Sequence, residues 1–112
     1  SGEGYGLPTL ESMACGIPQI GPRASSFIEL IDEDDRRDIG PRGILANGDW
    51  QLIQDGSYRF LVDEADLTNQ MKTIYQSEEL RKTFSKNAIK FAQDYTWEKI
   101  VKQWDQLLKT IK

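Results

Sequence analysis

The chain has 112 residues, of which 38% are hydrophobic and 29% are charged, and its net charge is −4. These values are typical of one soluble globular domain with a modest core, and no run of eighteen apolar residues predicts a transmembrane helix. The absence of histidine excludes a Ser-His-Asp or Cys-His catalytic mechanism built from this chain, and it argues against a zinc or haem site. Cys15 is the only cysteine, so no internal disulfide is expected, and we interpret it as a small buried apolar residue.

The charge is unevenly distributed, with −9 on residues 1–80 and +5 on residues 81–112. We interpret the basic end as solvated helix faces, with a peripheral contact to acidic lipid as the alternative. No basic stripe is interleaved with aromatic residues, so no nucleic-acid partner is expected. No basic and apolar leader opens the sequence, and we expect a cytoplasmic location.

The first 22 residues predict a glycine-rich turn, a short helix and a strand. Pro8 suits the start of a helix because its φ is already helical and it needs no amide partner there. Gly16 fits the left-handed position just after the helix, and Pro18 stops it. A short buried strand is expected over residues 17–20. The apolar side of the helix is expected to consist of Leu10, Met13 and Ala14.

The middle of the chain is less regular. Residues 25–31 predict a short helix with a serine cap. Six consecutive charged residues at 32–37, followed by Gly-Pro-Arg-Gly, predict a solvent-exposed loop over residues 32–43. A second strand is expected over residues 44–46, and Asn-Gly-Asp at 47–49 is a turn signal. The stretch to Ser57 is ambiguous, and residues 58–62 indicate an edge strand or an extended segment.

Three helices are predicted after residue 62, with Asp63, Ser77 and Thr96 as their capping residues. Carboxylates at Glu78 and Glu79 suit the positive end of the second helix dipole. The inner face of the first helix is expected to consist of Leu67, Met71, Ile74 and Tyr75. That of the second is expected to consist of Leu80, Phe84, Ala88 and Phe91. The third helix has the clearest apolar stripe, which consists of Trp97, Ile100, Val101, Trp104, Leu107, Leu108 and Ile111. Its two tryptophans need a large partner surface.

The order of these elements predicts the second half of an α/β domain, with a partial Rossmann-like, doubly wound parallel sheet and a helical C-terminal tail. Two or three parallel strands would leave a sheet edge without neighbours, so we expect further strands outside this chain. The sequence also opens inside a motif, which indicates a piece of a larger protein.

The glycine-rich start has features that could bind a phosphorylated ligand. Gly4 and Gly6 lack a Cβ, so a ligand can approach the main-chain amides, and the helix that follows directs its positive end to the same place. A diphosphate would suit that site, while Glu3 and Glu11 would accept hydrogen bonds from hydroxyl groups on either side. We place Glu11 in the first helical turn. Each feature also has an ordinary explanation, since Glu11 could serve only the helix dipole and Glu3 could be a solvated loop acid.

The complete string over residues 3–18, EGYGLPTLESMACGIP, closely resembles the donor-site signature of GT-B retaining glycosyltransferases, the family that includes sucrose and glycogen synthases. The family pattern is Glu-Gly-aromatic-Gly-Leu-Pro, then Glu-x-Met-Ala and Gly-x-Pro; Gln19 is a small departure from the apolar strand that follows. Glu29 resembles the loop acid of the family, and Tyr95-Thr96-Trp97 resembles the start of its terminal helix. The resemblance is specific over residues 1–20, moderate over 63–112 and poor over 32–62.

The resemblance implies that residues 1–112 are the C-terminal portion of a donor-binding domain, and that a UDP- or GDP-sugar is the ligand. Glu11 would bind the ribose hydroxyls, and Glu3 would bind the transferred sugar as the catalytic residue. Amides around Gly4, Tyr5, Gly6 and Leu7 would contact the sugar and the distal phosphate, and Thr9 would add a polar contact.

The resemblance further implies no metal and no other cofactor, because the family holds the leaving diphosphate with basic side chains and amides. The Arg and Lys that do so lie upstream of the motif, as does the acceptor-binding N-terminal domain. We therefore expect the complete protein to transfer a sugar and residues 1–112 alone to be inactive. Two alternatives remain: a non-catalytic module that binds nucleotides or phosphate, and an interaction domain that works through the helical face of residues 97–111.

Overall fold

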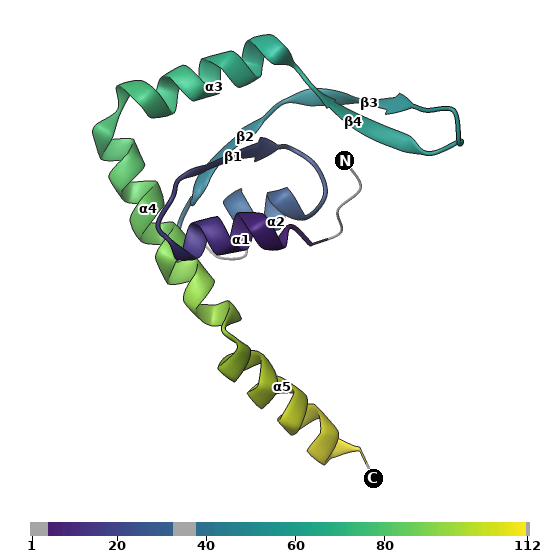
Figure 1. Cartoon of the computed structure of the whole chain (residues 1–112), viewed down its shortest axis with the longest axis vertical. Coiled ribbons are helices and arrows are strands. Elements are labelled where there is room, and N and C mark those ends of the chain that lie inside the picture. Colours follow the sequence, from purple (N-terminus) through teal and green to yellow (C-terminus); the bar gives the residue numbers. More distant parts are fainter. Residues whose placement is uncertain (1–4, 33–37, 112) are drawn as a thin grey trace.

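The computed structural model describes residues 5–32 and 38–111 and shows a mixed α/β chain (Figure 1). Strand β1 (Gln19–Pro22) pairs in parallel with β2 (Gly43–Ala46), and helix α2 (Ser26–Asp32) connects them and packs on both. Helix α1 (Leu7–Ala14) precedes β1. Figure 1 shows α1 and α2 together on one side of these strands. The predicted parallel strands are therefore present, displaced by up to two residues.

The end of α1 is set by its own sequence. Gly16 has a φ of +78°, and its N–H donates to the Met13 carbonyl oxygen at 2.9 Å, while the Ile17 N–H donates to the Ser12 carbonyl oxygen at 3.1 Å. These two bonds form a Schellman motif, in which a glycine takes the left-handed position and satisfies the last carbonyls. The prediction for Gly16 is confirmed.

The buried core is small, and it draws on helices from both ends of the chain. Helix α4 (Glu78–Ala92) packs against α1 and supplies Phe84, Ala88, Phe91 and Ala92 to the interior. The main cluster consists of Met13, Leu30, Ile31, Ile39, Leu45, Ala88, Phe91 and Ala92. Leu10 packs against it, whereas Ala14 and Cys15 are exposed. The expectations that both would be buried are wrong, because the core-facing side of this two-turn helix ends at Met13.

An antiparallel hairpin occupies the stretch that the sequence left ambiguous. Strand β3 (Gly48–Leu52) pairs with β4 (Tyr58–Val62), so the turn expected at residues 47–49 is wrong and the chain turns at residues 53–57 instead. There the Ile53 N–H donates to the Ser57 carbonyl oxygen at 2.9 Å, and Gly56 has a φ of +86°. A tight turn followed by a left-handed glycine is a common hairpin connection.

The loop expected over residues 32–43 is only partly a loop. Residues 33–37 lie outside the described residues, but Ile39 is 8% exposed and Arg42 is fully buried. The expected serine cap of α2 also differs, since Ser25 has a φ of +54° and not the extended conformation of a capping residue.

Three helical segments and one short 3₁₀ turn complete the chain: α3 (Glu64–Gln76), α4, η2 (Gln93–Tyr95) and α5 (Trp97–Thr110). All three predicted caps are confirmed, because the side chain of Asp63 accepts from Ala65 and Asp66 N–H, that of Ser77 from Leu80 N–H, and that of Thr96 from Lys99 N–H.

Helices α3 and α5 are covered only in part or not at all, and neither has a fully buried residue. Helix α3 packs on β2 and α4, and Leu67 and Ile74 of its expected inner face are half-buried, whereas Met71 and Tyr75 are exposed. The inner face expected for α3 is therefore confirmed in part, because a two-stranded sheet is too narrow to cover all of it. Figure 1 shows α5 extending away from the strands, and the radius of gyration of 16.4 Å exceeds the value of about 13 Å typical of a compact domain of this length. No helix among the described residues is long and apolar enough to cross a bilayer.

Candidate functional site

At the amino-terminal end of α1, Leu7 and Pro8 are exposed, and the first amides have no hydrogen-bond partner among the described residues. Gly6 precedes the helix with a φ of +87°, and no side chain of the described residues caps the first turn. The first N–H groups of a helix have no intrahelical partner, and Pro8 contributes none, so Leu7 and Thr9 present the amides of this turn. These donors and the positive end of the helix form an environment suited to an anion.

Close packing around Gly6, just before α1, favours a residue without a side chain. Gly6 is buried, and a Cβ added at this position would lie 3.2 Å from Leu30 Cδ1, 3.6 Å from Ser26 Oγ and 3.9 Å from Thr9 Oγ1. A side chain at this residue would therefore be strained by its positive φ and crowded by α2. The same contacts show that the start of α1 lies against the first turn of α2.

Glu11 lies one turn further along the helix than expected. It is the fifth residue of α1, and no acidic residue occupies the first turn. The first-turn placement is therefore wrong, because the helix begins at Leu7. The stabilising effect of an acid on a helix dipole falls off within the first turn, so this explanation of Glu11 becomes weaker. Its side chain is exposed on the same face as Leu7, which is 56% exposed.

Tyr5 lies between elements that are distant in sequence. Its pKa is raised by partial burial, and further by the nearby ionisable groups of Tyr95 and Glu29. The phenol therefore stays protonated at neutral pH and can donate a hydrogen bond. Tyr95 in turn packs on Phe91, with ring centroids 5.0 Å apart. Glu29, expected as a loop acid, lies within α2.

The structure thus brings Tyr5, Gly6, Leu7 and Thr9 together at one helix end, with Glu11 one turn beyond. Glu3 and Gly4 lie outside the described residues. Among the described residues, no group of three His, Cys, Asp or Glu side chains gathers in a metal-binding arrangement.

Arg42 fixes the elements behind this end of α1, and sequence reasoning missed it. Its guanidinium donates to the carbonyl oxygens of Leu30 at 2.8 Å, Glu29 at 2.7 Å and Gly40 at 3.1 Å. It also lies over the Phe91 ring, 4.2 Å from the centroid. Arg42 therefore binds the C-terminal carbonyls of α2 and links that helix to α4. A single arginine in a charged loop gives no sequence signal of this role.

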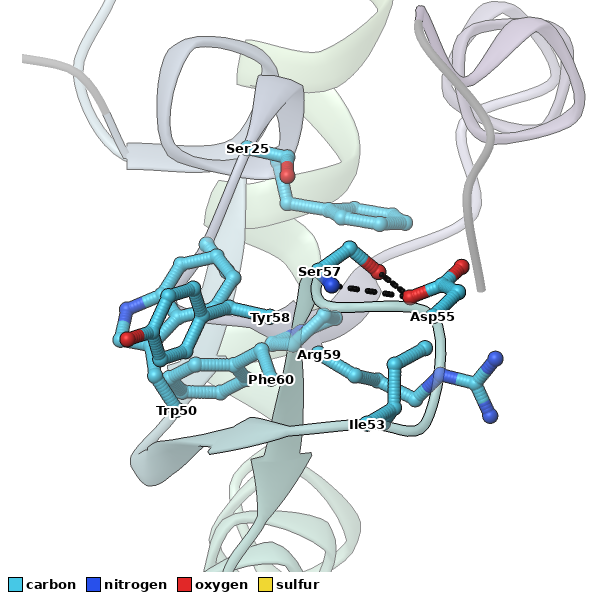
Figure 2. A pocket seen from close by; sticks show the side chains of 11 residues that line it. Ser25, Trp50, Ile53, Asp55, Ser57, Tyr58, Arg59 and Phe60 are labelled. Carbon is cyan, nitrogen blue, oxygen red and sulfur yellow. Dashed lines mark hydrogen bonds between the residues drawn. The ribbon is translucent and has the colours of Figure 1, made fainter.

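A second feature is a cavity of about 470 Å³ between the start of α2 and the hairpin (Figure 2). It begins at Pro22, where β1 ends, and continues along Ala24 and Ser25. In open α/β sheets, ligands bind outside the carboxyl ends of the parallel strands. The sequence signal for the hairpin side of the cavity is the alternation of Trp50 and Leu52, the Asp-Gly pair at 55–56, and then Tyr58 and Phe60.

Comparison with known proteins points to one class of enzyme. The chain is 29% identical, over 99 residues and 88% of its length, to an uncharacterized glycosyltransferase of Methanocaldococcus jannaschii. It is 38% identical, over 63 residues and 55% of its length, to N-acetyl-alpha-D-glucosaminyl L-malate synthase of Bacillus anthracis.

The matched regions cover 23% and 15% of these relatives, so the chain spans less than a quarter of the length of the curated relatives that it matches. No protein-family model and no solved structure matches the chain.

Proposed function

We propose that the protein containing this chain is a GT-B retaining glycosyltransferase, and that residues 1–112 are the C-terminal portion of its nucleotide-sugar binding domain. The observation that carries the proposal is the exposed start of α1, which no side chain of residues 5–32 or 38–111 caps, in a chain similar over 88% of its length to a named glycosyltransferase. The parallel β1–α2–β2 unit supports a doubly wound domain, of which this chain would hold only part.

In this proposal the diphosphate of a UDP- or GDP-sugar lies at the amides of Leu7 and Thr9. During transfer, the bond between the sugar C1 and the diphosphate oxygen breaks, an acceptor hydroxyl oxygen bonds to C1, and the hydroxyl proton passes to the departing diphosphate or to water. Negative charge then grows on the departing diphosphate. Oriented N–H groups stabilise such a charge because they need no reorganisation as it develops.

The remaining predicted residues would hold the donor by its hydroxyl groups. Glu11 would accept from the ribose, Glu3 would accept from the transferred sugar, and Tyr5 and Gly6 would line the path between them. A charged acceptor gives stronger hydrogen bonds than a neutral one and rejects analogues without the hydroxyl. We propose no metal, because amides and basic side chains elsewhere in the protein would balance the diphosphate. An acceptor-binding domain would complete the enzyme, and residues 1–112 alone would be inactive.

The donor site is tested with Glu11→Gln in the complete protein, measured by calorimetric titration with UDP- and GDP-sugars. Glutamine keeps the shape of the side chain and removes its charge, so donor binding should weaken by about 1–3 kcal/mol, the range for a lost hydrogen bond to a charged group. Glu79→Gln, an exposed glutamate of α4, is the matched control and should leave binding unchanged. Equal donor affinity of Glu11→Gln and the wild type would contradict the assignment.

The exposed apolar side of α5 favours a second function, an interaction domain that works through residues 97–111. Trp104 and Leu108 are 60% and 59% exposed. Under this alternative, capture of a partner would depend on Trp104 and be indifferent to Glu11, whereas the glycosyltransferase proposal requires the opposite dependence for donor binding.

A further inference from the structure

The β3–β4 hairpin has one apolar face, whose residues are paired across the strands. Trp50 is opposite Phe60, and Leu52 is opposite Tyr58. Side chains of directly opposed residues point to the same side of a hairpin, so these four lie on one face. The Trp50 and Phe60 rings contact edge to face, with centroids 5.3 Å apart. Trp50 remains 56% exposed and Tyr58 67% exposed, so ring surface is accessible to a ligand.

The cavity beside this face combines ring surface with polar groups. Figure 2 shows the rings of Trp50, Tyr58 and Phe60 together on one side, and Asp55 with Ser57 at the hairpin turn on the other. The volume of about 470 Å³ is within the range of about 300–1,000 Å³ for small-molecule sites.

The carboxylate of Asp55 is held in a fixed position. Its Oδ1 accepts from the Ser57 N–H at 2.8 Å and from the Ser57 hydroxyl at 2.6 Å. These bonds lower the pKa of Asp55, so the group stays ionised as an acceptor. Both use Oδ1, which leaves Oδ2 without a partner among the described residues. Arg59 also borders the cavity, but it alternates with Tyr58 and Phe60 along β4, so its guanidinium is directed to the other face of the hairpin (Figure 2).

This combination of ring surface and a charged acceptor is suited to a sugar ring. One side of a pyranose presents polarised C–H groups, which are attracted to the negative face of an aromatic ring, while its hydroxyls need acceptors and donors at the edge. A nucleobase could also stack on one of these rings, so UDP and GDP without a sugar are the competing ligands in the test below. A purely apolar ligand would bury the Asp55 charge without a partner, which is costly.

The cavity is adjacent to the amino-terminal end of α1. Ser26 Oγ lies 3.6 Å from the position of a Gly6 Cβ, and the next residue, Phe27, lines the cavity. One turn of α2 therefore borders both places. We propose that the cavity binds one pyranose ring, either the sugar of the donor or a sugar of the acceptor. The choice of these two sources rests on the proposed function, whereas the ring-binding site rests on the hairpin.

The test follows the indole N–H signal of Trp50 by NMR in the complete protein, assigned with Trp50→Phe. The probes are the methyl pyranosides of glucose, galactose, mannose and N-acetylglucosamine, the corresponding UDP- and GDP-sugars, and UDP and GDP alone. We expect at least one methyl pyranoside or nucleotide sugar to shift the Trp50 signal saturably and to leave the Trp97 signal in place.

The arms distinguish the two sources. A Trp50 shift with a nucleotide sugar but not with its nucleoside diphosphate identifies the donor sugar, and a shift with a methyl pyranoside added to the donor complex identifies an acceptor sugar. An equal shift with UDP or GDP alone overturns the proposal, because a base would then occupy the cavity. Absence of any Trp50 shift also overturns it. If Glu11→Gln leaves donor binding unchanged while Trp50 still responds to a pyranoside, the donor-site assignment fails and the cavity proposal stands.

Two variants quantify the contacts. Tyr58→Ala should weaken pyranoside binding about tenfold through loss of ring contact. Tyr75→Ala removes an exposed tyrosine of α3 that does not line the cavity, and it should have no effect. Asp55→Asn keeps the shape of the turn and should weaken binding about fivefold or more through loss of charge. Equal effects of Tyr58→Ala and Tyr75→Ala, or full affinity in Asp55→Asn, would contradict the proposed contacts.

Discussion

Arg42 offers the sharpest test of how the fold holds the candidate site. Arg42→Ala removes a fully buried guanidinium that donates to three carbonyl oxygens and covers the Phe91 ring. We expect the protein to be destabilised, because the C-terminal carbonyls of α2 then lose their donors and the space beside Phe91 empties.

The magnitude follows from the burial of each contact. The bond to Leu30 is buried, and an unsatisfied buried acceptor costs about 1–3 kcal/mol. The bonds to Glu29 and Gly40 are partly buried, so water can replace much of their value. The ring contact adds about 0.5–2 kcal/mol, and relief of the desolvated charge offsets part of the sum. The expected net loss is about 2–4 kcal/mol, a large part of the 5–15 kcal/mol typical of a native protein.

The assay is urea-induced unfolding of the complete protein, with amide hydrogen exchange in α2 and β2 as the readout. Arg42→Lys should lose about half as much, because one ammonium cannot replace a fork that reaches three acceptors. Arg59→Ala, an exposed arginine of β4, serves as the control and should change stability by less than about 0.5 kcal/mol. A loss in Arg42→Ala no larger than that of the control would refute the reasoning.

Two further predictions concern local backbone and charge. Gly6→Ala should destabilise the start of α1 by about 1–2 kcal/mol through its positive φ. The loss should exceed that of Gly56→Ala, since Gly56 shares the positive φ but a Cβ there meets nothing within 4 Å. Hydrogen exchange of the two segments measures both losses, and equal values would contradict the packing against Leu30. Ser57→Ala should raise the pKa of Asp55 by removing its largest stabilising bond, observed by NMR titration of the carboxyl carbon. Because the folded pKa is depressed, ionised Asp55 stabilises the fold above its unfolded pKa and loses that contribution as pH falls. The free energy of unfolding of the variant should therefore depend less on pH in the acidic range. An unchanged Asp55 titration would count against the hydroxyl bond.

Local features were predicted well because their determinants lie within a few residues. The caps at Asp63, Ser77 and Thr96 each satisfy an amide two or three residues ahead, and Gly16 closes α1 through bonds to carbonyls within the same turn. Such bonds join near neighbours, so the residue type often indicates them, although the serine cap predicted for α2 did not form because Ser25 has a positive φ.

Predictions that depended on distant partners were less successful. Arg42 was assigned to a solvent-exposed loop, but it is buried, because three carbonyls and the Phe91 ring converge on its position. The strand over residues 58–62, one of two alternatives predicted there, is present as β4, but its pairing with β3 was missed because the turn was predicted at 47–49 and not at the Asp-Gly pair at 55–56.

The candidate donor site shows the same division. Its candidate residues, from Tyr5 to Glu11, were predicted from the sequence alone, since glycine, proline and glutamate at these positions have specific conformational and hydrogen-bonding properties. That Gly6 lies against Ser26 and Leu30, and that a cavity opens beside the same turn of α2, was decided only in three dimensions. The physical reason is that hydrogen bonding and φ preferences act between near neighbours in the chain, whereas burial and cavities depend on which distant segments meet.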